Sequence, residues 1–483
     1  MNKTFRIVCS FLISMTLLFS VVFKLNAEPS KDFIKSKDTK FYDSNDKEYH
    51  IKSIGLGNGV WTSKDNGWQS YDHNEDTYKE IHDLGFNAVR YYFRYSWFEE
   101  KGSNGEPAIF ERFDRDIAWA KKYGIKIYFN MHYAPTNDFG FHGYSLWKLN
   151  DNKTNTENRA KVVAMWEALA KRYANEDTVL GWGLMNEPIP YYQENKTVKE
   201  MIQPWINTAK MFKDAIRKYD TNHIIFAELS PSVNKDGKYT GDIDGVSVMN
   251  ECMNQLKYQV FGNDNNYCFE FHCYTPWNFS SYGIDGSFEP LTEDGLKLRD
   301  NYMKNLSWKI KRLNVTPFLG EFGVSRNTFA SQGYKEELNG SSFVNETLDF
   351  CETSNVSFNY HQYRDNIFGL HSTSYKTMDN PDLYNVFKTR LAELYVEKEA
   401  EETEEVESKT PDNEVNVSED NTVKENEIDN KPNTDTDTST TVSSELPKTS
   451  GFNKNIYFEI GILAVIITAL VILNKSKSYL KHM

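Results

Sequence analysis

Eight short apolar runs recur along residues 51–360, and amphipathic stretches separate many of them. Strand-like runs that alternate with helix-like stretches predict a parallel sheet covered by helices. Eight such units in about 370 residues fit a closed (β/α)8 TIM barrel of the α/β class. A doubly wound sheet is the alternative, but no G-x-G-x-x-G follows the first strand. The expected strands are Ile51–Leu56, Asn87–Phe93, Lys126–His132, Val179–Met185, His223–Glu228, Cys268–Tyr274, Thr316–Gly320 and Val356–Tyr360.

Other local patterns complete the expected barrel domain, residues 28–398. Lys40–Tyr49 is typical of a hairpin, which we expect to plug the bottom of the barrel. Aromatic residues make up 14% of the chain, which indicates a sizeable core. Four cysteines form neither a CxxC pair nor a zinc pattern, so we expect mostly free, buried thiols at Cys252, Cys268, Cys273 and Cys351. The expected helices include Phe110–Tyr123, Asn158–Tyr173, Val198–Tyr219 and Gly295–Leu313.

The N-terminus carries the first of two hydrophobic segments near the chain ends. Lys3 and Arg6 precede the apolar run Ile7–Phe23, and the small residue Ala27 follows. A basic start, an apolar run and a small residue predict a secretory signal peptide over residues 1–27. An uncleaved membrane anchor is the alternative.

The C-terminal segment, residues 446–483, begins with the sequence LPKTSG, continues into the apolar run Ile456–Leu473 and ends in a basic tail. The apolar run is about long enough to cross a bilayer, and the lysines beyond it favour a cytoplasmic end. The segment resembles the sortase sorting signal of Gram-positive surface proteins, although Ser450 stands where that signal has glycine. The resemblance implies that sortase and cell-wall peptidoglycan are partners. Without sortase cleavage, the run predicts a transmembrane anchor at the outer surface.

Residues 399–445 predict a disordered acidic linker. They contain 16 acidic residues, 3 lysines and no aromatic residue, so they cannot bury enough apolar surface to fold. The formal net charge of the whole chain is −14, and no basic patch indicates a nucleic-acid partner. We expect a monomer.

Polar side chains follow six of the eight expected strands, where TIM barrels place their catalytic groups. Two of them are glutamates, Glu187 after strand four and Glu321 after strand seven. Cleavage of a glycosidic bond requires an acid for the leaving oxygen and a carboxylate at the anomeric carbon. A single glutamate after a strand is as often part of a surface ion pair as of a catalytic site, but two glutamates at strand ends predict a glycosidase. The other candidates are Arg90, His132, Asn186, His272, Tyr274 and His361.

These motifs resemble family 5 of the glycoside hydrolases, the cellulase and mannanase family, from about Lys40 to about Leu394. The family's Asn-Glu-Pro stands at Asn186–Pro188, and its His-x-Tyr at His272–Tyr274. Further matching segments are Gly55–Trp61, Leu84–Arg90, Ile127–Pro135 and Pro317–Gly323, with Tyr133 in place of the family's second histidine.

The resemblance implies a retaining double displacement that needs no metal or cofactor. Glu187 is expected to be the general acid/base and Glu321 the nucleophile, with the two carboxyls ~5–5.5 Å apart. We expect Arg90 to keep Glu321 ionised, and the neighbours of Glu187 to raise its pKa. The resemblance further implies that Asn186 binds the sugar 2-hydroxyl, that Arg90 and Tyr274 touch Glu321, and that His132 and His272 bind sugar or orient the pair.

The sequence departs from the family at the end of strand eight, where the family has a tryptophan under the sugar. Tyr360 or His361 stands there instead, which leaves the substrate open. An endo-1,4-β-glucanase is the first hypothesis, with a β-mannanase or exo-β-glucanase as alternatives. A catalytically inactive surface adhesin is a further alternative, although an adhesin has no need of both glutamates. Four tryptophans lie near the predicted rim, and each is expected either to stack on a sugar or to belong to the core: Trp61, Trp97, Trp147 and Trp277.

Overall fold

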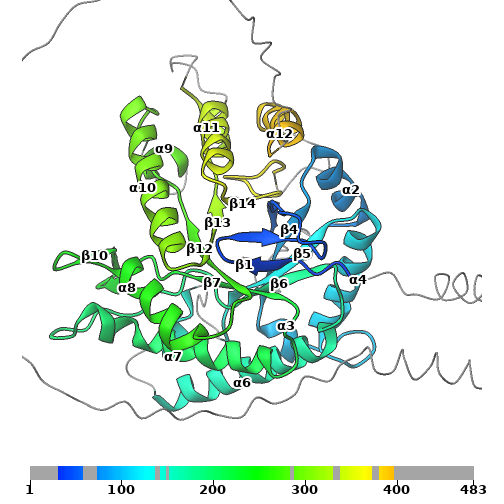
Figure 1. Ribbon diagram of the computed structural model, residues 1–483, viewed down its shortest axis with the longest axis vertical. Coiled ribbons are helices and arrows are strands. Elements are labelled where there is room, and N and C mark those ends of the chain that lie inside the picture. Colours follow the sequence, from blue (N-terminus) through cyan, green and yellow to red (C-terminus); the bar gives the residue numbers. More distant parts are fainter. Residues whose placement is uncertain are drawn as a thin grey trace, which may run out of the picture. The chain divides into compact units, whose positions relative to one another are not determined.

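The protein forms a closed barrel of eight parallel strands, in the order β12-β13-β14-β3-β4-β5-β6-β7. Figure 1 shows the helices arranged around these strands. The predicted (β/α)8 barrel is therefore confirmed. The chain divides into units of residues 1–400 and 401–483, and only the first contains described residues. The computed structural model describes residues 31–57, 73–135, 142–147, 152–282, 288–329, 338–372 and 380–395.

All eight predicted strands are present, with ends that differ by a few residues. The barrel closes where β14 pairs in parallel with β3, so that Tyr360 lies opposite Ile54. Glu321 and Phe322 belong to the seventh strand rather than to the loop after it. The strands are β3 (Lys52–Leu56), β4 (Ala88–Arg94), β5 (Lys126–Tyr133), β6 (Val179–Gly183), β7 (Ile224–Glu228), β12 (Tyr267–His272), β13 (Thr316–Phe322) and β14 (Ser357–Tyr360).

The four helices expected from the sequence are also present. Their start sites follow local chemistry: Thr197 caps α7 by accepting the backbone N–H of Glu200, whose side chain bonds back to Thr197. The longer helices are α2 (Glu75–Leu84), α4 (Ala108–Lys122), α6 (Asn152–Tyr173), α7 (Val198–Arg217), α10 (Glu293–Arg312), α11 (Gly340–Thr353) and α12 (Pro381–Glu393). The shorter ones are α3 (Ser96–Glu99), α5 (Tyr144–Trp147), α8 (Val248–Gln255), α9 (Trp277–Ser280), the π-helix Leu256–Phe261 and the 3-10 helix Arg326–Thr328.

A hairpin of β1 (Lys35–Lys37) and β2 (Lys40–Tyr42) packs against the barrel, and it begins five residues before the predicted Lys40–Tyr49. Phe41 is only 2% exposed because its ring lies against Phe226 and Phe318 of two barrel strands. Ser36 of the hairpin donates its backbone N–H to Asn266, just before β12, and its hydroxyl lies 2.8 Å from that of Thr316, the first residue of β13, so the hairpin covers the end of the barrel opposite the predicted site. The expected bottom plug is thus present with shifted bounds.

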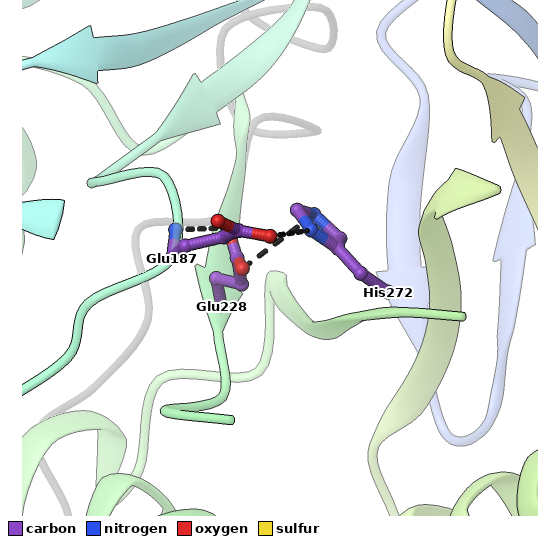
Figure 2. Close-up of side chains that lie close together, drawn as sticks. All are labelled: Glu187, Glu228 and His272. Atoms are coloured by element: carbon purple, nitrogen blue, oxygen red, sulfur yellow. Dashed lines mark hydrogen bonds and ion pairs between the residues drawn. The ribbon is translucent and has the colours of Figure 1, made fainter. Parts of the chain in front are cut away.

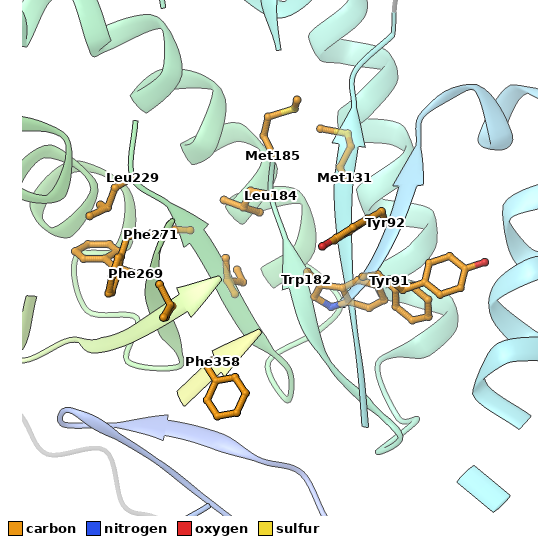
Figure 3. Packing of buried hydrophobic residues seen from close by; sticks show 14 of the residues in the cluster. Tyr91, Tyr92, Met131, Trp182, Leu184, Met185, Leu229, Phe269, Phe271 and Phe358 are labelled. Atoms are coloured by element: carbon orange, nitrogen blue, oxygen red, sulfur yellow. The ribbon is translucent and has the colours of Figure 1, made fainter. Parts of the chain in front are cut away.

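Alternation along the strands separates the core from the site. Outward-facing Tyr91 and Trp182 pack against Phe113 of α4 and Trp166 of α6, at ring-centroid distances of 5.5 Å and 6.0 Å. Figure 3 shows Tyr91 and Trp182 among the packed side chains of this layer. Their neighbours along the strand point the other way, because successive side chains of a strand face opposite sides. Arg90 and Tyr92, the neighbours of Tyr91, therefore face the barrel interior, where the polar groups of the site lie beyond an apolar layer that includes Phe226 and Phe318.

Two small hairpins lie between β7 and α8, where the sequence analysis named no elements. They are β8 (Val233–Lys235) with β9 (Lys238–Thr240), and β10 (Asp242–Ile243) with β11 (Val246–Ser247). The expectation for the cysteines is confirmed, since Cys252, Cys268, Cys273 and Cys351 are free and buried. Among the described residues, the helices lack the length and apolar character needed to cross a bilayer. The segments Ile7–Phe23 and Ile456–Leu473 lie outside the described residues.

Candidate active site

All eight predicted site residues lie within or directly after barrel strands, toward the same end of the barrel. Glu321 is at the centre of the group and is only 4% exposed. Arg90 forms an ion pair with its Oε1, and the Tyr274 hydroxyl donates to its Oε2 at 2.7 Å. Burial alone would raise the pKa of Glu321, but the positive potential of His272, His361 and Arg90 holds that pKa well below its usual value. The carboxylate is therefore ionised, as a nucleophile must be.

Arg90 is fully buried and joins several groups of the site. Its Nη2 lies 2.8 Å from Oε1 of Glu270 and donates to Oδ1 of Asn186 at 3.1 Å. Burial opposes the charge of Arg90, but Glu270, Tyr128 and Glu321 raise its pKa further above the usual value. Gly320 makes room for this arrangement, since a Cβ there would lie 2.0 Å from Oε1 of Glu270. The close approach of Glu270 thus explains why glycine, and no larger residue, precedes Glu321.

Glu187 follows β6 with a φ of 41°, an uncommon backbone conformation for a residue with a side chain. Its backbone N–H donates to Oε2 of Glu228 at 2.8 Å, which holds the turn in place. Nδ1 of His272 lies 3.1 Å from Oε1 of Glu187, and Nε2 of the same ring lies 3.5 Å from Oε1 of Glu228. Figure 2 shows the imidazole facing both carboxylates. The Glu187 side chain stays 26% exposed, so a substrate can reach it.

The expected rise in the pKa of Glu187 is wrong for this structure. Burial would raise that pKa, but the hydrogen bond and positive charge of His272 lower it. Burial would likewise lower the pKa of His272, yet the charges of Glu228 and Glu321 and the bond to Glu187 keep it well above its usual value. These directions favour a charged His272 hydrogen-bonded to an ionised Glu187.

The spacing of the two predicted catalytic carboxyls can be bounded through His272. Its Nδ1 lies 3.1 Å from Oε1 of Glu187 and 3.6 Å from Oε2 of Glu321. These two oxygens are therefore within about 7 Å of each other, a bound that is compatible with the ~5–5.5 Å carboxyl spacing of retaining enzymes.

His361 occupies the place at the end of β14 where the resembled family has tryptophan. Its Nδ1 is 2.9 Å from the Tyr92 hydroxyl and 3.7 Å from Oε2 of Glu321. Tyr360 turns away: it is fully buried, and its ring packs on Phe322 and on Phe387 of α12. Of the two alternatives, His361 therefore faces the site.

Tyr92 also lies beside His132, with ring centroids 4.6 Å apart and a tilt of 34°. His132 is 4% exposed, and burial lowers its pKa well below the usual value, which keeps it neutral. Neutral His132 can hydrogen-bond a sugar hydroxyl without adding charge.

The four tryptophans named at the predicted rim differ in position. Trp97 and Trp147 are buried, whereas Trp277 is 48% exposed with its ring 6.1 Å from that of Tyr274. Trp61, like residues 58–60 of the first motif, lies outside the described residues.

Three residues at this site were missed from the sequence. Glu228 is the last residue of β7, so the strand-end rule already contained the signal for it. Glu270 lies two residues before His272 on β12 and so faces the same side, which the period of a strand predicts. Tyr92 has the same relation to Arg90 on β4.

Glu187, Glu228 and His272 also present ligand atoms within 4.8 Å of one another, close enough to consider a metal ion. The geometry does not favour a shared ion, because the two carboxylates contact different nitrogens of the imidazole. Such an arrangement suits an imidazolium that donates from Nδ1 to Glu187 and lies at ion-pair distance from Glu228.

A barrel that brings two glutamates together at its open end, one ionised by arginine and one bonded to a protonated histidine, defines a glycoside hydrolase. A sequence profile of the cellulase family (glycosyl hydrolase family 5) matches residues 43–366. The chain belongs to this family.

Individual relatives are more distant. The chain is 24% identical over 286 residues to cellodextrinase A of Ruminococcus flavefaciens, a match that covers 57% of this chain and 76% of the relative. It is 24% identical over 330 residues to a β-xylosidase of Phanerodontia chrysosporium, covering 65% of this chain but only 60% of that enzyme. Among solved structures, Thermotoga maritima Cel5A in complex with mannotriose gives a TM-score of 0.52 at 20% identity, over 70% of this chain and 97% of the other. This last similarity shows the shared fold.

Proposed function

We propose that this chain is a retaining endo-β-1,4-glucanase in which Glu321 is the nucleophile and Glu187 the general acid/base. The bridging position of His272 carries the proposal, since one ring nitrogen lies within 3.6 Å of an oxygen of each glutamate. That closeness supports the short carboxyl spacing of a double displacement, in which Glu321 attacks the anomeric carbon directly.

In the first step, Glu321 attacks the anomeric carbon while Glu187 protonates the departing oxygen. Arg90 and Tyr274 keep the attacking carboxylate ionised and oriented. Glu187 receives the proton that it donates from His272, across the hydrogen bond between them, and is left as a carboxylate after this step. In the second step, Glu187 accepts a proton from water, which then releases the sugar from Glu321.

Glucan is favoured as the substrate by the names of the relatives, which include a cellodextrinase and endoglucanases. Mannan is the second candidate, because Thermotoga maritima Cel5A, which shares the fold, was solved with both cellobiose and mannotriose. Reducing-sugar release from soluble cellulose, mannan and β-1,3-glucan separates these substrates. A rapid fall in viscosity relative to sugar release is expected for endo action, and the first anomer formed, read by NMR, is expected to be β.

We further propose that the enzyme is exported and held at the outer surface of a Gram-positive cell. The signal-peptide pattern of residues 1–27 and the sorting-type pattern of residues 446–483 support this placement. Cell-wall fractionation of the producing organism, with and without the LPKTSG sequence, tests it. Release of the deletion variant from the wall fraction is expected, and an unchanged intracellular distribution of both forms contradicts the proposal.

A further inference from the structure

A cluster of tyrosines stands beside Glu187 on the side away from Glu321. We call Tyr144, Tyr191 and Tyr239 the tyrosine wall. The rings of Tyr144 and Tyr191 are 4.8 Å apart, and His142 lies between the wall's two parts, with its ring 5.5 Å from both Tyr144 and Tyr239. These residues come from the segments around α5, the chain after Glu187 and the β8–β9 hairpin.

His142 connects the wall to the acid/base residue. Its Nδ1 lies 3.1 Å from the backbone carbonyl oxygen of Glu187 and 3.7 Å from Oε2 of that residue. Burial lowers the pKa of His142, so the ring is neutral, and Nδ1 must carry the proton because a carbonyl only accepts. Nε2 is then an acceptor for the Tyr239 hydroxyl, 3.3 Å away. Tyr239 is thereby fixed in position.

The two oxygens of Glu187 face different surroundings. Oε1 lies toward His272, which it shares with Glu321, whereas Oε2 lies toward His142 and the tyrosine wall. Glu187 therefore stands between the nucleophile and the wall. Since a general acid contacts the oxygen of the leaving group, the surface on the wall side of Glu187 is where the departing sugars lie.

The hairpin that carries Tyr239 is firmly attached. Asn234 donates its backbone N–H to the Pro190 carbonyl at 2.8 Å and accepts from the Tyr192 N–H at 2.8 Å. The Asn234 side chain also donates to the Tyr144 hydroxyl at 2.9 Å. Tyr239 nevertheless remains 57% exposed. A large aromatic ring held in place yet open to solvent, next to a catalytic acid, offers a preorganised stacking surface.

We propose that the tyrosine wall is the leaving-group subsite of the enzyme, and that Tyr239 stacks on a β-linked pyranose of the departing polysaccharide chain. This inference rests on the proposed role of Glu187 as acid/base. It assigns a binding role to the β8–β9 hairpin, which lies outside the catalytic group described above.

The test compares leaving groups. Tyr239→Ala is expected to lower kcat/KM for cellotetraose and cellopentaose about tenfold, through lost stacking. The same variant is expected to lose much less kcat/KM for cellobiosyl fluoride, because the fluoride leaving group is too small to stack on the Tyr239 ring. Tyr239→Phe keeps the ring and is expected to stay near wild type on both substrates. Tyr258→Ala is the matched control, because Tyr258 is 70% exposed on the π-helix Leu256–Phe261.

Equal losses on the oligosaccharides and on cellobiosyl fluoride in Tyr239→Ala overturn the proposal, because Tyr239 then acts only through His142 and Glu187. No loss on either substrate overturns it as well. A wild-type enzyme that cleaves neither substrate refutes the proposed function itself, so the two failures are distinguishable.

Discussion

Replacing Glu228 by glutamine tests whether the proton of the acid/base residue is held by the charges around His272. The amide carbonyl of Gln can still accept the Glu187 N–H that Glu228 accepts at 2.8 Å, so the turn is kept. What is lost is a negative charge 3.5 Å from Nε2 of His272. The variant therefore separates electrostatics from positioning.

The size of the effect follows from Coulomb's law. A unit charge at this distance contributes about 5 kcal/mol at an effective dielectric constant of ~20, which corresponds to an upper limit of roughly 3.5 pH units. Burial and the negative charges of Glu270 and Glu187 raise the pKa of Glu228 well above its usual value, which makes the charge lost in the variant smaller than a full unit and the effect smaller than this limit. We expect the pH profile of activity to move by about 1 pH unit, within that limit.

The direction in which the pH profile moves follows from the direction in which the pKa of His272 is shifted. That pKa is raised in part by Glu228, so it falls when the charge is removed, and the His272–Glu187 pair loses its proton at lower pH. The basic limb of the kcat/KM profile on cellotetraose, whose sugar leaving group needs this proton, is expected to move to lower pH, while the acidic limb, set by Glu321, stays in place. Glu293→Gln, at an exposed site on α10, is the control. A basic limb in Glu228→Gln that coincides with wild type refutes the reasoning.

Three further predictions address the roles of single residues. Glu321→Ala is expected to lose at least ~10³-fold in kcat, and added azide should restore turnover to a product of inverted configuration. Glu187→Ala is expected to spare the first step on aryl glycosides with good leaving groups and to give an azide product of retained configuration. The opposite pattern would mean that the roles are exchanged. Tyr274→Phe removes the 2.7 Å hydrogen bond to Glu321, so the pKa of Glu321 should rise and the acidic limb of kcat/KM should move to higher pH. Gly320→Ala places a Cβ against Glu270 and is expected to lower the free energy of unfolding by ~1–3 kcal/mol or more, measured by urea denaturation, and an unchanged midpoint would contradict the packing.

The family resemblance and the strand pattern were enough to place Glu187, Glu321, Arg90, His272 and Tyr274 at the mouth of one barrel. This succeeded because strand periodicity is a local property, and parallel strands of a barrel direct all their ends to the same face. The free state of the cysteines followed for a similar reason, since their spacing shows no pairing motif.

The protonation of the site was decided by the tertiary structure. The expected direction of the pKa shift of Glu187 was wrong because that direction depends on His272, which lies 85 positions away along the chain. The parts played by Glu228 and Glu270 depend likewise on the distances across the barrel to His272 and Arg90. The tyrosine wall was also invisible in the sequence, because its members come from three separate segments. The order of the chain alone determines which residues follow a strand. The electrostatic potential at a buried carboxyl, by contrast, is a sum over neighbouring charges that only folding brings within a few ångströms.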